Sequence, residues 1–295
     1  MKWNGVIPAM TTAFKSDLSV DLKSVGEHAQ WLVENGCTGV VPLGSLGESA
    51  TLRFDEKVEI LKTCVRALDG KPVAAGIASL STAEAVELAR AAENAGCSGL
   101  MVLPPYVYTS DWREMKAHVQ AVIRATKLPC MLYNNPVSYR TDFLPRQIAE
   151  LADENPNLAA VKESSADARR VTAIKALCGD RLAVLVGVDD LIVEGVRAGA
   201  VGWIAGLVNA LPKESVSLFN MAKANAPRTG ELYSWFLPLL RMDTVNKFVQ
   251  LIKLVQQEVG RGHERVRPPR MTLAGAERKA ALETLKHALA RRPKL

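Results

Sequence analysis

Residues 130–164 read CMLYNNPVSYRTDFLPRQIAELADENPNLAAVKES, and they predict one complete structural unit. Two nearly continuous apolar runs, Cys130–Pro136 and Leu158–Ser164, are typical of strands that are covered on both faces. Between them, Leu144–Glu154 carries apolar residues at three- and four-residue steps, which predicts a helix. The stretch therefore predicts a strand–helix–strand unit of an α/β protein with a parallel sheet.

The same alternation extends in both directions along the chain. Six further apolar runs predict strands at Val6–Thr12, Gly39–Ser45, Val73–Ala78, Gly99–Pro105, Ala183–Asp189 and Gly202–Val208. Segments with helical periodicity lie between the runs, at Leu22–Glu34, Asp55–Leu68, Thr82–Ala95, Trp112–Thr126, Ala166–Cys178 and Leu191–Ala198. Eight such strands predict an α/β fold of the (β/α)8 or TIM barrel type. A doubly wound open sheet is the alternative, but no GxGxxG motif follows the first strand.

The residues after the eighth strand predict further helices, at Lys213–Ala224, Gly230–Leu240, Val245–Val259 and Leu273–Arg291. The first of these completes the barrel, and the other three predict a C-terminal helical extension. We therefore expect residues 1–224 to form the barrel domain and residues 225–295 to form an extension that packs on it.

Composition and charge exclude several classes of protein. Hydrophobic residues make up 48% and charged residues 23% of the 295 residues, which excludes a disordered chain or a coiled coil. No apolar run reaches the roughly 18 residues of a membrane span, and the start of the chain does not resemble a signal peptide, so we expect no membrane partner and a cytoplasmic location. The net charge of +6 is accompanied by no nucleic-acid-binding motif, and it suits a small carboxylate substrate better.

The cysteines and histidines show no pattern that is typical of a metal site. The five cysteines are Cys37, Cys64, Cys97, Cys130 and Cys178, and none lies closer than 27 residues to the next. The four histidines include no HExxH motif. We expect free thiols and no metal ion.

Lys162 is the most informative single residue. It follows four apolar residues inside a predicted strand, where a lysine is costly unless it has a partner or a role. Apolar surroundings disfavour an ammonium ion and supply the neutral amine that attacks a carbonyl carbon. Because barrel active sites lie at the carboxyl ends of the strands, the position favours a Schiff-base lysine. A lysine paired with Glu163, or one that reaches solvent at the strand end, is the structural alternative.

Polar groups end the neighbouring strands. Tyr133 lies one strand from Lys162, where a phenol can transfer protons during imine chemistry, although it could equally be a core tyrosine with its hydroxyl on the backbone. The turn from Gly44 to Gly47 combines small residues with the Ser45 hydroxyl, and its amides can hold a carboxylate. The seventh strand ends at Asp189 and Asp190, whose acidic side chains could cap the next helix and take no part in the site.

Several motifs in the same order identify a family. They are Gly5-Val-Ile-Pro-Ala-Met-Thr-Thr, Gly44…Gly47-Glu48, Tyr133-Asn-x-Pro136, Val161-Lys162-Glu-Ser and Gly199-Ala-x-Gly202-x-Ile204. Over essentially its whole length the chain resembles the dihydrodipicolinate synthase/N-acetylneuraminate lyase family, whose members are Schiff-base-forming (β/α)8 enzymes. The resemblance implies that the enzyme needs no cofactor and forms a homo-oligomer, a tetramer or a dimer.

The resemblance also implies a role for each site residue. Lys162 is the imine-forming lysine, Tyr133 is the proton shuttle and Ser45 belongs to the proton relay. The backbone amides of Gly44, Leu46 and Gly47 hold the substrate carboxylate, and Ile204 contacts the substrate through its backbone. Many members carry Thr at the position of Leu46, so that hydroxyl is lost here.

Three departures bear on the substrate. The synthases of the family have a second Tyr where this chain has Val107, and an Arg where it has Ser138, with Arg140 two places later. With Leu46, these changes argue against a synthase. Three segments, Gly202–Pro212, Trp235–Leu240 and Gly260–Arg270, are similar to the 1-pyrroline-4-hydroxy-2-carboxylate deaminases of hydroxyproline degradation, which release ammonia and 2-oxoglutarate semialdehyde. The alternatives are a 2-keto-3-deoxy sugar acid dehydratase or aldolase, a 4-hydroxy-tetrahydrodipicolinate synthase, and a non-catalytic ligand sensor.

Overall fold

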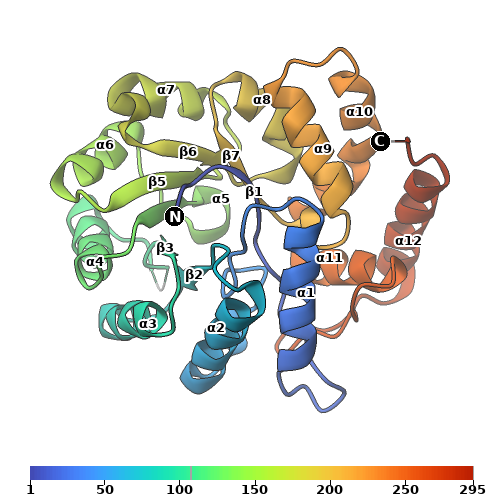
Figure 1. Cartoon of the computed structure of the whole chain (residues 1–295), viewed down its shortest axis with the longest axis horizontal. Helices are drawn as coiled ribbons and strands as arrows, with labels where there is room; N and C mark the ends of the chain where they lie inside the picture. The colour runs from blue at the N-terminus through green and yellow to red at the C-terminus, as the bar shows by residue number, and fades with distance from the viewer. Residues whose placement is uncertain (107, 295) are drawn as a thin grey trace.

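The strands form the centre of the molecule. The computed structural model describes residues 1–106 and 108–294. Seven strands pair in parallel in one sheet, in the order β1-β7-β6-β5-β4-β3-β2. They are β1 (Gly5–Pro8), β2 (Ala74–Ile77), β3 (Gly99–Val102), β4 (Cys130–Asn134), β5 (Leu158–Glu163), β6 (Ala183–Val186) and β7 (Gly202–Ala205). Figure 1 shows the strands at the centre and the helices around them, which confirms the predicted α/β barrel.

The predicted strand Gly39–Ser45 is the one departure from eight regular strands. It makes only isolated parallel bridges, between Val41 and Ala9 and between Val40 and Val73. These bridges place it between β1 and β2, so the ring still closes. The ladder cannot continue because Pro42 has no N–H to donate and Leu43 adopts φ 65°. The prediction of a closed barrel is therefore right, and the prediction of a regular second strand is wrong.

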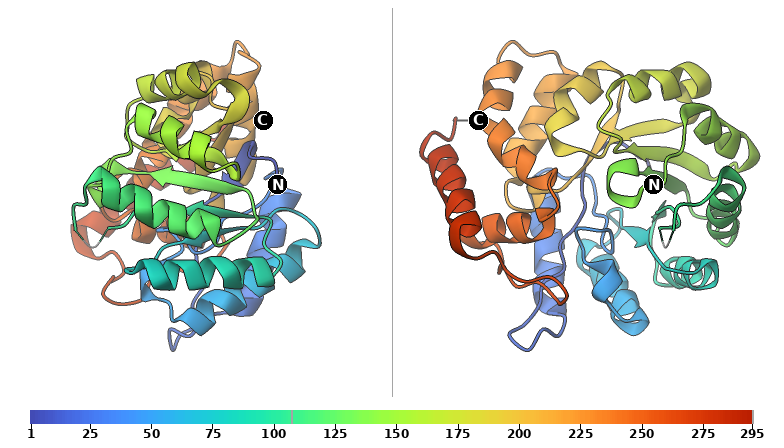
Figure 2. Two further views of the ribbon diagram at one scale, coloured as in Figure 1. Left: turned by 90° about the vertical axis from the view of Figure 1, so that its left-hand side faces the viewer. Right: turned by 180° about the vertical axis from the view of Figure 1, so that it is seen from behind.

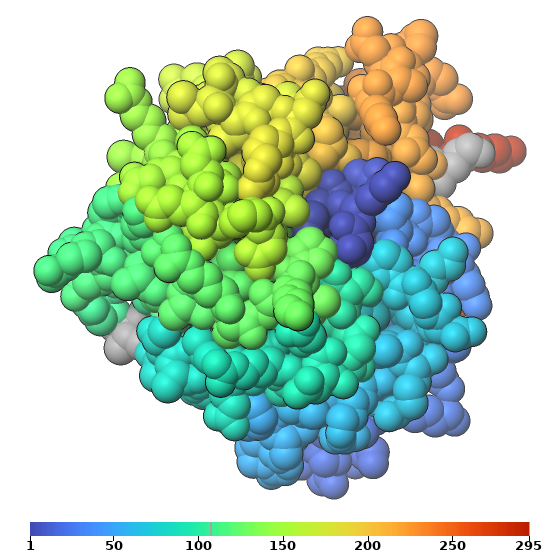
Figure 3. All heavy atoms as spheres, turned by 60° about the vertical axis from the view of Figure 1, so that its left-hand side comes forward, coloured from blue at the N-terminus to red at the C-terminus, as the bar shows by residue number. Residues whose placement is uncertain are grey.

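Helices cover the outside of the ring. Those of the barrel are α1 (Leu22–Glu34), α2 (Phe54–Leu68), α3 (Thr82–Asn94), α4 (Trp112–Arg124), α6 (Pro145–Glu154), α7 (Arg169–Cys178), α8 (Ile192–Arg197) and α9 (Pro212–Lys223). The short helix α5 (Pro136–Tyr139) lies over the end of the ring instead. Figure 2 shows these helices from two further sides. In Figure 3 the dark-blue N-terminal residues lie beside yellow and orange ones, as expected where β1 pairs with β7.

The strands are buried on both faces, as their apolar runs predict. All four residues of β2, of β3 and of β7 are buried. Each buried Val, Leu or Ile side chain contributes about 1.5–3 kcal/mol through loss of contact with water. Any charged group inside the ring therefore has mainly apolar neighbours. Of the five cysteines, all free, four are buried.

A short helix that the sequence analysis did not predict follows β4. The predicted strand Cys130–Pro136 ends at Asn134, and Pro136 begins α5. The Asn135 side chain accepts a hydrogen bond from the amide of Ser138 at 2.9 Å, and Pro136 occupies the first helical position, where its missing N–H costs nothing. This single turn folds the chain back and brings Tyr139 to the end of the barrel.

The C-terminal extension contains α10 (Thr229–Leu240), α11 (Phe248–Glu258) and α12 (Gly275–Ala290). It is attached to the barrel by a buried ion pair in which Lys253 Nζ lies 2.7 Å from Glu48 Oε1. A second pair joins Arg267 to Glu56 at 2.8 Å. Across the described part of the chain, no helix is both long and apolar enough to cross a bilayer.

Candidate active site

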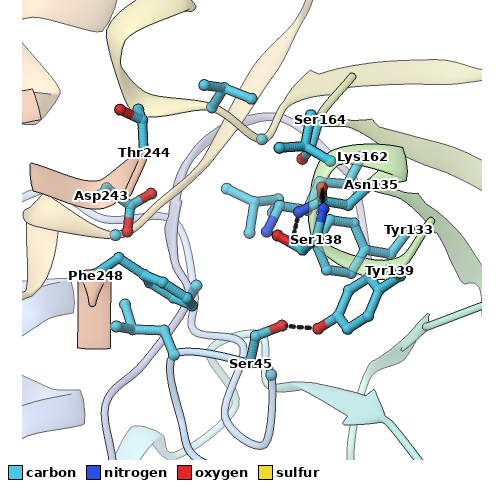
Figure 4. Close-up of a pocket in the computed structure, with 18 of the residues that line it drawn as sticks. Ser45, Tyr133, Asn135, Ser138, Tyr139, Lys162, Ser164, Asp243, Thr244 and Phe248 are labelled. Carbon is cyan, nitrogen blue, oxygen red and sulfur yellow. Dashed lines mark hydrogen bonds between the residues drawn. The ribbon is translucent and has the colours of Figure 1, made fainter. Parts of the chain in front are cut away.

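Lys162 and Tyr133 lie next to each other at the ends of neighbouring strands. The strand register pairs Lys162 on β5 with Tyr133 on β4. Lys162 is only 6% exposed, and its Nζ lies 4.0 Å from the centre of the Tyr133 ring. Figure 4 shows both side chains at the cavity. The arrangement places an amine beside a phenol inside the barrel, as the sequence analysis predicts.

The structural alternative, a pair between Lys162 and Glu163, is wrong. Glu163 accepts hydrogen bonds from Asn134 Nδ2 at 3.1 Å and from the amide of Ser165 at 2.7 Å. Successive residues of a strand point to opposite faces, so Glu163 faces away from Lys162. Burial raises the pKa of Glu163. Its hydrogen bonds link the ends of β4 and β5, and they leave the amine of Lys162 to face the cavity.

Gly187 makes room for Lys162. A Cβ atom at Gly187 would lie 2.6 Å from Lys162 Cε and closer still to Ser164 Oγ, which real Cβ atoms do not tolerate. Gly187 follows β6, the strand beside β5, so the lysine side chain passes over bare backbone on its way to the cavity. A glycine at this position is therefore required by the extended lysine.

Three hydroxyl groups gather on the Tyr133 side of the cavity. Ser45 and Tyr139 share a hydrogen bond, and the Tyr139 ring meets the Tyr133 ring edge-on at 5.9 Å between centroids. Tyr133 Oη accepts from Asn135 Nδ2 at 2.9 Å, so it is not tied to the backbone. Burial, and then the neighbouring Tyr133, raise the pKa of Tyr139 above its ordinary value. We call Ser45, Tyr133 and Tyr139 the hydroxyl wall.

The turn at Gly44 forms part of the lining of the cavity. Gly44, Ser45 and Leu46 line it, and Ile204 on β7 faces it from another side. Gly47 does not line it: a Cβ there would lie 2.9 Å from the Met10 carbonyl oxygen, so Gly47 serves the tight packing behind the turn. The structure therefore brings together six of the seven predicted site residues and places Gly47 behind them.

The cavity has a volume of about 760 Å³, and part of its wall comes from the C-terminal extension. The lining residues that the sequence analysis missed include Tyr139, Asp243, Thr244, Asn246, Phe248 and Arg270. Asp243 and Thr244 lie opposite the hydroxyl wall in Figure 4, and we call these two residues the carboxyl wall. Within residues 1–106 and 108–294, no cluster of His, Cys, Asp and Glu could hold a metal ion.

Asp189 does not cap the following helix. It accepts hydrogen bonds from the Trp203 indole at 3.0 Å and from the amides of Gly206 at 3.0 Å and Leu207 at 2.8 Å. Burial raises the pKa of Asp189 to about 6, and those donors oppose the shift. Burial, and then the charge of Asp189, raise the pKa of Asp243 well above its ordinary value. The carboxyl groups of Asp189 and Asp243 are therefore neighbours whose hydrogen-bond surroundings differ.

The structure describes some, but not all, of the positions at which this chain departs from the synthases. Ser138 lines the cavity, and so does the exposed Arg140, which follows α5 with φ 54°. A cationic side chain is thus present at the mouth of the cavity although it comes two residues late. Val107 lies outside the described residues.

Comparisons with known proteins point to one family. The profile of the dihydrodipicolinate synthetase family matches residues 2–288. The 4-hydroxy-tetrahydrodipicolinate synthase of Chelativorans sp. is 32% identical over 292 residues, which are 97% of this chain and 98% of that protein. The synthase of Methanothrix thermoacetophila is 35% identical over 241 residues, 81% of each chain.

Solved structures extend the likeness to the fold. The dihydrodipicolinate synthase from Aquifex aeolicus superposes with a TM-score of 0.92 at 27% identity, covering 97% of this chain and 98% of that one. YagE of E. coli K12, a family protein in complex with pyruvate, gives 0.91 at 25% identity, with 97% and 99% coverage. The chain therefore belongs to the dihydrodipicolinate synthetase family and is a class I, Schiff-base-forming lyase of that family.

Proposed function

We propose that Lys162 forms the Schiff base with the 2-carbon of a small 2-oxo-acid-like substrate. The observation that carries this proposal is the position of its amine, which is buried beside Tyr133 and makes no ion pair with the described residues. The Lys162 amine adds to the carbon beside the carboxylate, and the protonated imine then withdraws electrons from the bond to C3. The amides at Gly44, Ser45 and Leu46 hold the carboxylate.

The hydroxyl wall moves the protons. Tyr133 is the phenol nearest Lys162, so it takes and returns the proton at C3. Tyr139 lies between Tyr133 and Ser45, which continues the chain of hydroxyl groups toward the turn at Gly44. The resemblance implies a tyrosine from a neighbouring subunit in the relay of the synthases. Here Tyr139 of the same chain is hydrogen-bonded to Ser45, and we propose that it takes the place of that tyrosine.

Within this class of reaction we propose deamination of 1-pyrroline-4-hydroxy-2-carboxylate. The wall opposite Tyr133 supports this choice, because Asp243 and Thr244 can form hydrogen bonds with a hydroxyl or an amine and offer no positive charge to a second carboxylate. Lys162 opens the ring by imine exchange, the 4-hydroxyl leaves as water, and the amine on C5 becomes an imine that water hydrolyses to ammonia and an aldehyde. Hydrolysis of the Lys162 imine releases 2-oxoglutarate semialdehyde, so the net reaction consumes one water.

A second candidate, 4-hydroxy-tetrahydrodipicolinate synthase, is favoured by the printed names of the relatives and by Arg140. The product of that reaction is a dicarboxylate, and Arg140 at the mouth of the cavity could pair with its second carboxylate. Dehydration or aldol cleavage of a 2-keto-3-deoxy sugar acid uses the same Lys162 and Tyr133.

One panel of assays separates these reactions. The purified protein is incubated with the hydroxylated pyrroline, with 2-keto-3-deoxy acids and with the substrates of the synthase, and ammonia, pyruvate, aldehyde and dipicolinate-type products are measured. We expect ammonia release from the pyrroline to be the fastest reaction. Faster formation of the dicarboxylate would make the protein a synthase. In parallel, borohydride reduction and peptide mapping locate the imine, and a stable adduct on a lysine other than Lys162 would overturn the whole scheme.

A further inference from the structure

Asp243 is a carboxyl group of the cavity for which the proposed mechanism has no role. It ends the 3₁₀ turn Arg241–Asp243 that follows α10, and with Thr244 it forms the carboxyl wall. Figure 4 shows its carboxyl group across the cavity from Tyr133 and Tyr139. A substrate held on Lys162 would therefore have phenols on one side and this carboxyl group on the other.

The backbone at Gly206 allows Asp243 to occupy this place. A Cβ atom at Gly206 would overlap the Asp243 carboxyl group. The Gly206 amide is itself held by the Asp189 carboxylate at 3.0 Å. Asp189 thus fixes the backbone over which Asp243 reaches the cavity, although the two aspartates lie far apart in the sequence.

The hydrogen bonds decide which of the two aspartates carries a proton. Three N–H donors point at Asp189, from Trp203, Gly206 and Leu207, and donors of this kind stabilise a carboxylate. The described residues supply no hydrogen bond to the Asp243 carboxyl group, which lies beside that anion. Like charges at close range are not both ionised, so Asp189 is the carboxylate and Asp243 the neutral acid.

The other acid of the cavity is already engaged. Asp190 lines the cavity, but its Oδ2 lies 3.6 Å from Arg241 Nε and its carbonyl oxygen accepts from the Tyr233 hydroxyl. Its charge is therefore partly balanced and its backbone fixed. Asp243 remains as the acid that has a proton to give.

We propose that Asp243 is the general acid that protonates a hydroxyl leaving group on C4 of the imine-bound substrate. This inference rests on the proposed function, because it names the substrate class as a 4-hydroxylated 2-oxo-acid imine. Tyr133, on the other side, removes the proton from C3 and leaves an enamine. The nitrogen lone pair then restores the C2 iminium, the C2–C3 pair forms the C3–C4 double bond, and the C4–O bond breaks.

The proton of Asp243 goes to the departing oxygen, so that water leaves and Asp243 becomes a carboxylate. The next proton from water regenerates the acid, and no oxidant or reductant is required. Thr244 Oγ1 lies on the same wall, where it can accept a hydrogen bond from the 4-hydroxyl before the bond breaks. The stereochemistry of the substrate hydroxyl is then set by which wall it faces.

The test compares wild type with Asp243→Asn, and uses Asp180→Asn, an exposed aspartate of the barrel surface, as the matched control. Three rates are measured for each: exchange of the pyruvate methyl protons in D₂O, ammonia release from the 4-hydroxy pyrroline, and turnover of its 4-chloro analogue. Chloride leaves without a proton, so the analogue does not need an acid. We expect Asp243→Asn to lose about 100- to 10,000-fold with the hydroxyl substrate, as for loss of a general acid.

We expect the same variant to stay within about threefold of wild type in the exchange and with the chloro analogue. Equal turnover of the hydroxyl substrate by wild type and Asp243→Asn would overturn the assignment, and so would an equal loss with both leaving groups, which would indicate a purely structural role. Failure of the proposed function has a different signature. In that case wild type itself exchanges pyruvate protons but releases no ammonia from the pyrroline.

Discussion

The hydroxyl wall and the carboxyl wall face the same cavity, but different parts of the chain build them. Tyr133 and Ser45 stand at the ends of two barrel segments, and Tyr139 follows directly in α5. Asp243 and Thr244 come from the turn between α10 and α11, far along the chain. Strand register thus places Tyr133, and the turns that follow barrel segments place Ser45 and Tyr139, whereas the packing of the extension places the carboxyl wall.

This difference separates two functions. In the mechanism that we propose, the hydroxyl wall carries the imine chemistry, and the residues from the extension face the part of the substrate beyond C3. Changes in the hydroxyl wall should therefore affect every substrate, and changes in the carboxyl wall or in its support should affect only substrates that extend beyond C3. The four predictions below test this division, from the largest effect on imine chemistry to the smallest.

Lys162→Ala should abolish imine formation with every substrate, because no other amine lies beside Tyr133 in the described structure. Mass spectrometry after borohydride reduction measures the adduct. Lys175→Ala, which removes a lysine at the end of α7 outside the cavity, is the control and should trap the substrate normally. Full turnover by Lys162→Ala would contradict the assignment.

Tyr133→Phe should slow proton exchange at C3 by about 100- to 10,000-fold, because the phenol that moves the proton is lost while the ring remains. NMR of pyruvate in D₂O measures the exchange, and borohydride trapping at long incubation shows whether the imine still forms. A variant that exchanges protons at the wild-type rate would remove Tyr133 from the mechanism and leave the hydroxyl wall as packing.

Ser45→Ala and Tyr139→Phe should each slow the exchange about tenfold, the effect of losing one hydrogen bond of about 1.5 kcal/mol in the transition state. Because the two hydroxyl groups bond to each other, the double variant should be no slower than either single variant. A double-mutant cycle on the exchange rate measures this coupling. Fully additive losses would show that Ser45 and Tyr139 act separately.

Lys253→Met should leave proton exchange within about threefold of wild type, because Lys253 anchors the extension and does not touch the hydroxyl wall. It should lower the free energy of unfolding by about 3–5 kcal/mol, because Glu48 would remain as a buried charge without its partner. Denaturant unfolding measures the loss. The double variant Lys253→Met/Glu48→Gln should recover much of the stability, and an exchange rate that falls with the stability would break the division between the two walls.

Lys162 and Tyr133 were predictable because each is a polar residue at the end of an apolar run, and parallel strands bring such ends to one edge. Tyr139 was missed because the predicted strand was drawn through Pro136. The signal was present: Asn135 before Pro136 is a favoured start for a helix, and a turn there points the fourth residue back at the strand. Gly47 was assigned to the site from its place in the turn, but its backbone faces Met10.

Asp243 could not have been predicted as a site residue. Nothing in Arg241-Met-Asp243 differs from an exposed polar turn, and the proton that we propose on Asp243 depends on the neighbouring Asp189, which lies 54 residues earlier. The prediction of a regular second strand was wrong for a reason that is visible in the sequence, because Pro42 interrupts the ladder. Only the bridges to Ala9 and Val73 show that the ring closes in spite of it.

The sequence by itself determined the barrel and the position of the proposed imine site. Apolar runs of a fixed kind must be covered on both faces, and the period of the chain then places Lys162 and Tyr133 at one edge. The tertiary structure decided what faces them, because the C-terminal extension reaches the cavity through contacts such as Lys253 with Glu48, which join residues 205 positions apart. No local pattern encodes such contacts, since they depend on the packing of whole elements. The strand pattern therefore places the groups that we propose for imine chemistry, and the packing of the extension places the groups that we propose for selection among substrates.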